Sequence, residues 1–222
     1  MSIANYLGCL ASAVLCAYLI GSIPFGLLIG FMKGVDIRTQ GSCNIGATNV
    51  TRVVGKIWGK LCFVCDFLKG LLPVLAVHFI WNRYSGQQEQ TLQSGILISL
   101  TAMGTVLGHI FPLYLKFKGG KGVSTAAGAV MALNPLSVVI AAMVWVLTFF
   151  TSRYVSLASI AAAIALPLAA WLLIHAGIPM SLPVGILLIF FAVLTIWRHR
   201  SNIQRLLNGT ESRFEKKKTE TK

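Results

Sequence analysis

The sequence GHIFPLYLKFKGGKGVSTAAG at residues 108–128 organises this chain, because one apolar run ends inside it at Leu115 and another begins at Val123. Between the two runs, lysines alternate with glycines: Lys116, Lys118, Gly119, Gly120, Lys121 and Gly122. Glycine lets the backbone approach a ligand closely, and successive N–H groups before a helix N-terminus form an anion site. The stretch therefore predicts a phosphate-binding loop, although basic residues beside an apolar run are also common topology signals.

The composition of the chain is typical of a membrane protein. Of its 222 residues, 56% are hydrophobic and only 11% are charged. The formal net charge is +13. In a membrane protein, this excess of positive charge indicates basic cytoplasmic loops and contact with anionic membrane lipids, and it argues against nucleic acid as a partner. The same charge suits an anionic substrate.

Seven apolar runs predict an all-α integral membrane protein with about seven transmembrane helices, in one domain over residues 1–222. The runs cover residues 3–32, 61–81, 92–115, 123–133, 136–150, 155–174 and 184–197. If each run crosses once, every lysine and arginine except Lys69 and Arg83 lies on one side. That asymmetry predicts a cytoplasmic C-terminus and an external N-terminus. Residues 123–133 are too short to span a bilayer, and we expect a half-helix buried in protein.

The first polar segment, residues 33–60, contains the sequence VDIRTQGSCNIGATNVTR. It carries small hydrogen-bonding residues followed by an arginine: Ser42, Asn44, Thr48, Asn49 and Arg52. Such residues can form several hydrogen bonds to one phosphate, and an arginine can form two in parallel. The alternative is a series of turns with a helix N-cap at Ser42 or Thr48.

Two ionisable residues, Asp66 and Lys69, lie inside the second apolar run, three positions apart on one face of a helix. Ionisable groups within a membrane span are costly and are therefore candidates for function. The alternative is a structural ion pair between the two side chains. Cys62 and Cys65 form a C-x-x-C in the same run, and we interpret them as packing residues. No spacing of His, Cys, Asp or Glu in the chain resembles a metal site.

The third polar segment, RHRSNIQRLLNGTESR at residues 198–213, begins a basic cytoplasmic tail over residues 198–222. His199 and Asn202 are three positions apart and would share one face of a helix, and Glu211 follows them. The second polar segment is the lysine- and glycine-rich stretch at residues 116–125. On the predicted topology, all three polar segments meet at the cytoplasmic face. A histidine at a membrane edge is often only an interfacial residue, but this one lies beside two phosphate-type segments.

Together, these motifs resemble those of the bacterial acyl-phosphate:glycerol-3-phosphate acyltransferases. The resemblance is carried by five motifs and covers nearly the whole chain: GSIPFG (21–26), DIRTQGSCNIGATNVTR (36–52), DFLKG (66–70), GHIFPLYLKFKGGKG (108–122) and RHRSNIQRLLNGTESR (198–213). It implies a seven-helix enzyme of the bacterial inner membrane with a cytoplasmic active site. The implied reaction transfers a fatty acyl group from acyl phosphate to the 1-hydroxyl of glycerol 3-phosphate, giving lysophosphatidic acid and phosphate. This is the first step of phospholipid synthesis, and it implies a functional link to the enzyme that produces acyl phosphate.

The resemblance also implies roles for individual residues. The resemblance assigns catalysis to Ser42, Arg52, His199 and Asn202, and a structural role to Glu211. It assigns substrate binding to Gly119, Gly120, Lys121 and Gly122, and the residue types add Asn44, Thr48, Asn49 and Lys118 to the candidate substrate-binding residues. For Asp66 and Lys69 we predict the structural role of an ion pair. No cofactor is expected. A covalent acyl-enzyme is unnecessary because acyl phosphate is already activated, and orientation with charge neutralisation can suffice. The general base is open between His199 and a phosphate oxygen of the substrate.

Two other classes of protein fit parts of the pattern. A coenzyme A-dependent acyltransferase would carry a histidine followed five positions later by aspartate, and no histidine here has that partner: His78, His109, His175 or His199. A transporter for a phosphorylated solute would also use basic loops and broken helices, but it predicts polar motifs on both faces or through the midplane. Because the motifs gather on one predicted face, an enzyme is favoured.

Overall fold

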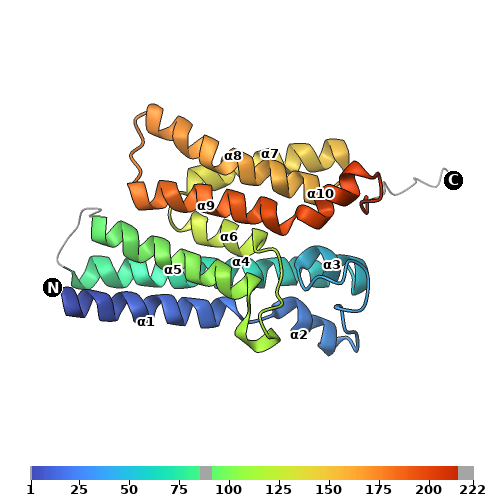
Figure 1. The fold of residues 1–222 in the computed structure, drawn as a ribbon, viewed down its shortest axis with the longest axis horizontal. Coiled ribbons are helices and arrows are strands. Elements are labelled where there is room, and N and C mark those ends of the chain that lie inside the picture. The colour runs from blue at the N-terminus through green and yellow to red at the C-terminus, as the bar shows by residue number, and fades with distance from the viewer. Residues whose placement is uncertain (1, 86–91, 215–222) are drawn as a thin grey trace.

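The computed structural model describes residues 2–85 and 92–214, and every regular element in these residues is a helix (Figure 1). The helices are α1 (Ile3–Gly21), α2 (Phe25–Met32), α3 (Ala47–Val53), α4 (Lys56–Tyr84), α5 (Leu92–Ile110), the 3₁₀ helix η1 (Leu113–Leu115), α6 (Val123–Met131), α7 (Pro135–Ser152), α8 (Val155–His175), α9 (Leu182–Arg198) and α10 (Arg200–Leu207). The predicted all-α architecture is confirmed. Within the predicted basic tail, residues 215–222 lie outside the described residues.

The long helices account for most of the predicted membrane spans. Five stretches are long and apolar enough to cross a membrane: Ile3–Met32, Lys56–Tyr84, Leu92–Leu115, Pro135–Ser152 and Val155–His175. A sixth candidate span combines α9 and α10, which are bent by 55° on either side of His199. The remaining apolar run forms α6, whose nine residues are too short to span a bilayer. A total of seven crossings and the orientation of the termini stay predictions.

The short helix α6 is held inside the protein by direct contact with α4. A side chain at Gly70 of α4 would collide with the backbone oxygen of Thr125, and one at Gly128 of α6 would collide with that of Phe67. The two glycines therefore let the two backbones approach closely, as small residues do between membrane helices. This packing fixes the point where α6 begins, directly after the lysine- and glycine-rich loop.

The helices form an elongated bundle whose polar segments gather at one end. α1 packs against α5, α4 against α6, and α7 against α8. Figure 1 shows α2, α3 and α10 at the end of the bundle opposite the N-terminus. The main apolar core, with Val106 and Phe191, joins α5, α6 and α9. A second apolar cluster around Ile37 and Val50 fixes α3 against α2 and α4, so the first polar segment is held by an apolar cluster separate from the main core.

Candidate active site

A cavity of about 150 Å³ lies where the three polar segments meet. The first segment contributes Ser42, Asn44, Thr48, Asn49 and Arg52, the second contributes Lys121 and Gly122, and the third contributes His199, Asn202 and Glu211. The structure thus brings together segments that lie far apart in the chain, as the sequence indicated. Further lining residues come from α4, α5, α7 and α8, which close the sides of the cavity.

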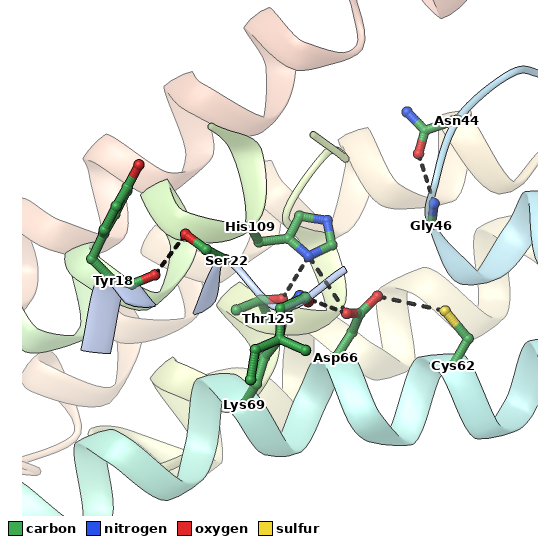
Figure 2. Close-up of polar contacts among 10 residues, drawn as sticks. Tyr18, Ser22, Asn44, Gly46, Cys62, Asp66, Lys69, His109 and Thr125 are labelled. Atoms are coloured by element: carbon green, nitrogen blue, oxygen red, sulfur yellow. Dashed lines mark hydrogen bonds and ion pairs between the residues drawn. The ribbon is translucent and has the colours of Figure 1, made fainter. Parts of the chain in front are cut away.

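Asn49 shapes the first segment from inside the protein. It is 1% exposed, its Oδ1 accepts a hydrogen bond from the Ser42 N–H at 2.8 Å, and its Nδ2 donates to two backbone oxygens of the preceding loop at 2.8 and 3.1 Å. Asn44 acts more locally, because its Oδ1 accepts from the Gly46 N–H at 2.9 Å (Figure 2). Both amides therefore build the loop that carries Ser42, a role that the sequence does not reveal.

The backbone of Gly119 and Gly120 is engaged within the protein. Their N–H groups donate to the last two carbonyl oxygens of α5, each at 3.1 Å, and their own oxygens accept from Arg198 Nη2 at 3.2 and 2.9 Å. A Cβ at Gly120 would also collide with the His109 ring. The geometry thus gives these glycines a packing role, and neither they nor the exposed Lys118 line the cavity.

The part of this loop that faces the cavity is the start of α6. Gly122 adopts the left-handed φ of 81° just before the helix, and Val123 and Ser124 line the cavity beside Lys121. The first N–H groups of a helix have no partner within that helix, and together with the helix dipole they attract anions. The predicted anion site is therefore best supported at the N-terminus of α6.

A chain of polar contacts links the second segment to the third. Lys121 Nζ donates to Asn202 Oδ1, and Asn202 Nδ2 donates to Glu211 Oε1 at 2.7 Å. Glu211 also accepts hydrogen bonds from Ser156 Oγ and Arg205 Nε, both at 2.7 Å. Burial opposes the ionisation of Glu211, but these hydrogen bonds outweigh it and hold its pKa below the ordinary value.

The cavity carries more positive than negative charge. Burial, together with the positive charges of Arg205 and Arg52, lowers the pKa of Lys121 to about 8, although Glu211 opposes the shift. Arg52 itself has no ion pair in the part of the chain that the structure describes. A phosphate dianion would restore the balance, because opposite charges attract strongly where water is scarce.

His199 lies at the bend between α9 and α10, lines the cavity and is 2% exposed. Its Nδ1 is 2.8 Å from the Thr195 carbonyl oxygen. Because a carbonyl oxygen only accepts hydrogen bonds, Nδ1 carries the proton, and in the neutral ring Nε2 is left as an acceptor. In this tautomer Nε2 can accept a proton, as a general base must, and the role of His199 in catalysis stays a prediction.

Asp66 and Lys69 lie in a buried cluster with His109 and Thr125 (Figure 2), and His109 also lines the cavity. Asp66 Oδ1 and Lys69 Nζ form an ion pair at 2.8 Å, and His109 Nδ1 lies 3.6 Å from the same oxygen. Thr125 Oγ1 is 3.2 Å from His109 Nδ1, and Lys69 Nζ donates to the Ile23 oxygen at 2.7 Å. The cluster ties α4, α5 and α6 to the break between α1 and α2. This arrangement favours a structural ion pair over a catalytic role for Asp66 and Lys69.

Several cavity residues are not among the predicted site residues: Phe63, His109, Trp145, Val155, Ser156 and Ser159. Trp145 Nε1 donates to Ser159 Oγ at 3.2 Å, so α7 and α8 are joined at the cavity wall. The spacing of Ser156 and Ser159 on one face of α8 is a signal that could have revealed both serines. For His109 the sequence gives only a weak signal of a site role, namely its position just before the lysine- and glycine-rich loop.

These features define a class: an all-helical protein with membrane-spanning helices and a basic cavity at one end of the bundle. Within residues 2–85 and 92–214, no group of three or more His, Cys, Asp or Glu is arranged to hold a metal ion. Residues 11–209 match the glycerol-3-phosphate acyltransferase family. The chain belongs to this family.

The individual relatives confirm the resemblance that the motifs indicated. The glycerol-3-phosphate acyltransferase of Aquifex aeolicus is 46% identical over 201 residues, which cover 90% of this chain and 97% of the relative. That of Desulforamulus reducens is 43% identical over 93% of this chain and 96% of the relative. Among solved structures, the integral membrane glycerol 3-phosphate acyltransferase PlsY (YgiH) is similar in its glycerol 3-phosphate form, with a TM-score of 0.80, and in its lysophosphatidic acid form, with 0.78. Both structures are 43% identical to this chain and cover 93% of it. The match extends over 96% of the chain in the glycerol 3-phosphate form and 95% of the chain in the lysophosphatidic acid form. The protein is therefore an all-α integral membrane protein.

Proposed function

We propose that this protein transfers a fatty acyl group from acyl phosphate to the 1-hydroxyl of glycerol 3-phosphate, giving lysophosphatidic acid and phosphate. The observation that carries the proposal is the cavity itself, where Arg52, Lys121 and the N-terminus of α6 meet. Family membership supports it, since the solved relative has a glycerol 3-phosphate form and a lysophosphatidic acid form. As the first step of phospholipid synthesis, the reaction links this protein to the enzyme that supplies acyl phosphate.

The two substrates each carry a phosphate, so the site needs positive charge at two points. Lys121 and the first N–H groups of α6, next to Gly122, supply one point. Arg52, flanked in the cavity lining by Ser42 and Thr48, supplies the other. Asn44 and Asn49 act by shaping the loop that carries Ser42, and Gly119 and Gly120 act by packing against the end of α5.

The acyl chain requires an apolar surface beside these charges. Phe63 of α4, Trp145 of α7 and Val155 of α8 line the same cavity as the basic residues. All three helices are long enough and apolar enough to cross a membrane. We therefore propose that the chain of the donor lies against these side chains while its phosphate reaches the basic end, which explains why the enzyme is embedded in lipid.

The transfer step forms one bond and breaks another. The 1-hydroxyl oxygen of glycerol 3-phosphate attacks the acyl carbonyl carbon, an ester C–O bond forms, and the bond from that carbon to the phosphate oxygen breaks. Its electron pair leaves with phosphate, and the hydroxyl proton passes either to His199 Nε2 or to a phosphate oxygen. Lys121, held by Asn202, and Arg52 stabilise the negative charge on the departing phosphate.

We further propose that the cavity faces the cytoplasm from the bacterial inner membrane. Basic residues support this orientation, because cytoplasmic loops carry an excess of lysine and arginine. Four such residues belong to the segments around α2 and α3, at the same end of the bundle as the cavity: Lys33, Arg38, Lys56 and Lys60. Cys43 offers a test, since it is exposed in the loop before α3. In a variant that keeps only this cysteine, a membrane-impermeant maleimide should label inside-out vesicles and leave right-side-out vesicles unlabelled. The reverse pattern would overturn the orientation.

The activity itself is tested with purified protein in detergent. We expect palmitoyl phosphate and labelled glycerol 3-phosphate to give labelled lysophosphatidic acid, with one phosphate released for each molecule formed. Palmitoyl coenzyme A in place of palmitoyl phosphate should give none. A protein that forms no product, but carries labelled glycerol 3-phosphate into sealed vesicles, would be a transporter, and the proposed function would fall.

A further inference from the structure

Residues 212–214, which we call the C-terminal strap, are fastened to α7 and to the turn between α7 and α8. The Phe214 N–H donates to the Arg153 oxygen at 3.0 Å, and Arg213 Nε donates to the last carbonyl oxygen of α7 at 3.2 Å. The Phe214 ring packs edge-on against Phe149 of α7, with ring centroids 5.9 Å apart. Backbone and side chains both contribute, so the strap has a defined position on the helix bundle.

The same strap holds Arg52, which belongs to α3 and lies 160 residues earlier in the chain than Ser212. Arg52 Nη2 donates to the Ser212 oxygen at 3.2 Å, and the guanidinium carbon is 5.1 Å from the centroid of the Phe214 ring. Arg52 forms no ion pair among the described residues. Glu211, the acidic residue of the cavity lining, is bonded to other side chains instead.

This arrangement orders the arginine and still leaves donors for a ligand. A guanidinium carries five N–H donors in one plane. The strap accepts a hydrogen bond from Nη2 and places an aromatic ring next to the guanidinium, while Arg52 still lines the cavity. An arginine that is already ordered loses less conformational freedom when it binds a phosphate than a free one does.

We propose that Phe214 is a positioning residue for acyl transfer: by holding the guanidinium of Arg52, the C-terminal strap presents that side chain to a substrate phosphate. The inference rests on the proposed function, because it takes Arg52 as a phosphate ligand. A merely structural role for Phe214 predicts a loss of stability. A positioning role predicts instead a change in the kinetic constants that Arg52 itself controls.

The test compares Phe214→Leu, which keeps an apolar side chain but removes the ring, with Phe214→Tyr, which keeps the ring. Phe79→Leu is the matched control, since Phe79 is 71% exposed on α4. kcat, KM for glycerol 3-phosphate, KM for palmitoyl phosphate and Tm are measured for each purified variant and for Arg52→Lys. We expect Phe214→Leu to lose about 3- to 30-fold in kcat/KM, the range that corresponds to a cation–π contact. Its Tm should be unchanged, and it should raise the same KM as Arg52→Lys, whereas Phe214→Tyr and Phe79→Leu should stay within about twofold of the wild type.

Three results would overturn the positioning role: normal kinetics of Phe214→Leu, an equal loss in Phe214→Tyr, or a rise in the KM that Arg52→Lys leaves unchanged. If Phe214→Leu lowers Tm, Phe214→Met replaces it, because methionine fills irregular apolar space without a ring. The wild-type assay separates this inference from the function on which it rests. An inactive wild type contradicts the function, whereas an active wild type with normal Phe214→Leu kinetics contradicts the strap alone.

Discussion

Two groups of charged residues lie inside this protein, and they differ in charge balance and in space. In the buried cluster, Asp66 and Lys69 neutralise each other at 2.8 Å, with both side chains at most 3% exposed. In the cavity, Lys121 and Arg52 border a volume of about 150 Å³. The carboxylate beside them, Glu211, is already bonded to its own partners.

The difference shows what marks a ligand site in a membrane protein. Taking a charge out of water is costly in both groups. Where opposite charges pair between packed helices and do not line the cavity, as Asp66 and Lys69 do, the residues hold helices together. Where positive charge exceeds negative charge beside an open volume, a phosphate can supply the missing balance. Asp66 and Lys69 are the more conspicuous residues in the sequence, yet the cavity is the better candidate site.

Breaking the buried pair should have the largest effect, and it should act on stability. Lys69→Met leaves Asp66 as a buried carboxylate without its ion-pair partner, which costs about 3–5 kcal/mol of free energy of unfolding. The double variant Asp66→Asn/Lys69→Met should recover most of that loss, because no unpaired charge remains. Thermal unfolding in detergent measures both. Equal Tm values for Lys69→Met and the wild type would show that the pair does not stabilise the bundle.

Changing the cavity arginine should act on catalysis and leave stability unchanged. An ammonium lacks the planar fork that forms two parallel bonds to a phosphate, so Arg52→Lys should lose on the order of 10- to 100-fold in kcat/KM. Its Tm should match that of the wild type, in contrast to Lys69→Met. Steady-state kinetics with both substrates give the answer, and near-normal activity would show that Arg52 is not a phosphate ligand.

The cavity should also respond to pH through Lys121. Its pKa is lowered to about 8 in the folded protein, so above pH 8 the side chain loses the charge that binds phosphate. KM for glycerol 3-phosphate should therefore rise about 10-fold between pH 7 and 9, while the substrate phosphate stays a dianion. Unfolding does not explain such a rise, because a lowered lysine pKa makes the unfolded state bind more protons and stability increases with pH in this window. Lys121→Arg, which stays charged, should flatten the profile, and an unchanged slope in that variant would exclude Lys121 as the titrating group.

The sequence predicts the meeting of the polar segments because each interrupts the apolar pattern on the same side of the membrane. It does not predict how each residue is used, since that depends on contacts between distant segments. Asn49 resembles a ligand in the sequence but fills the loop from inside, and Gly120 resembles a phosphate contact but makes room for His109. The contact between Arg52 and Phe214 spans most of the chain, and no local pattern announces it.

The smallest expected effect separates two lysines that lie close together in the sequence. Lys118 is exposed and does not line the cavity, whereas Lys121 lines it and donates to Asn202. Exposed charges are screened by water and salt and contribute little. We therefore expect Lys118→Gln to change kcat/KM by less than about twofold, and the matched variant Lys121→Gln to lose on the order of 10- to 100-fold. Both lysines come from the same predicted phosphate loop, so only their positions in the fold distinguish them. A tenfold loss of kcat/KM in Lys118→Gln would mean that the loop turns into the cavity when substrate binds. Lys118 would then belong to the site in the substrate-bound state, although it lies on the surface here.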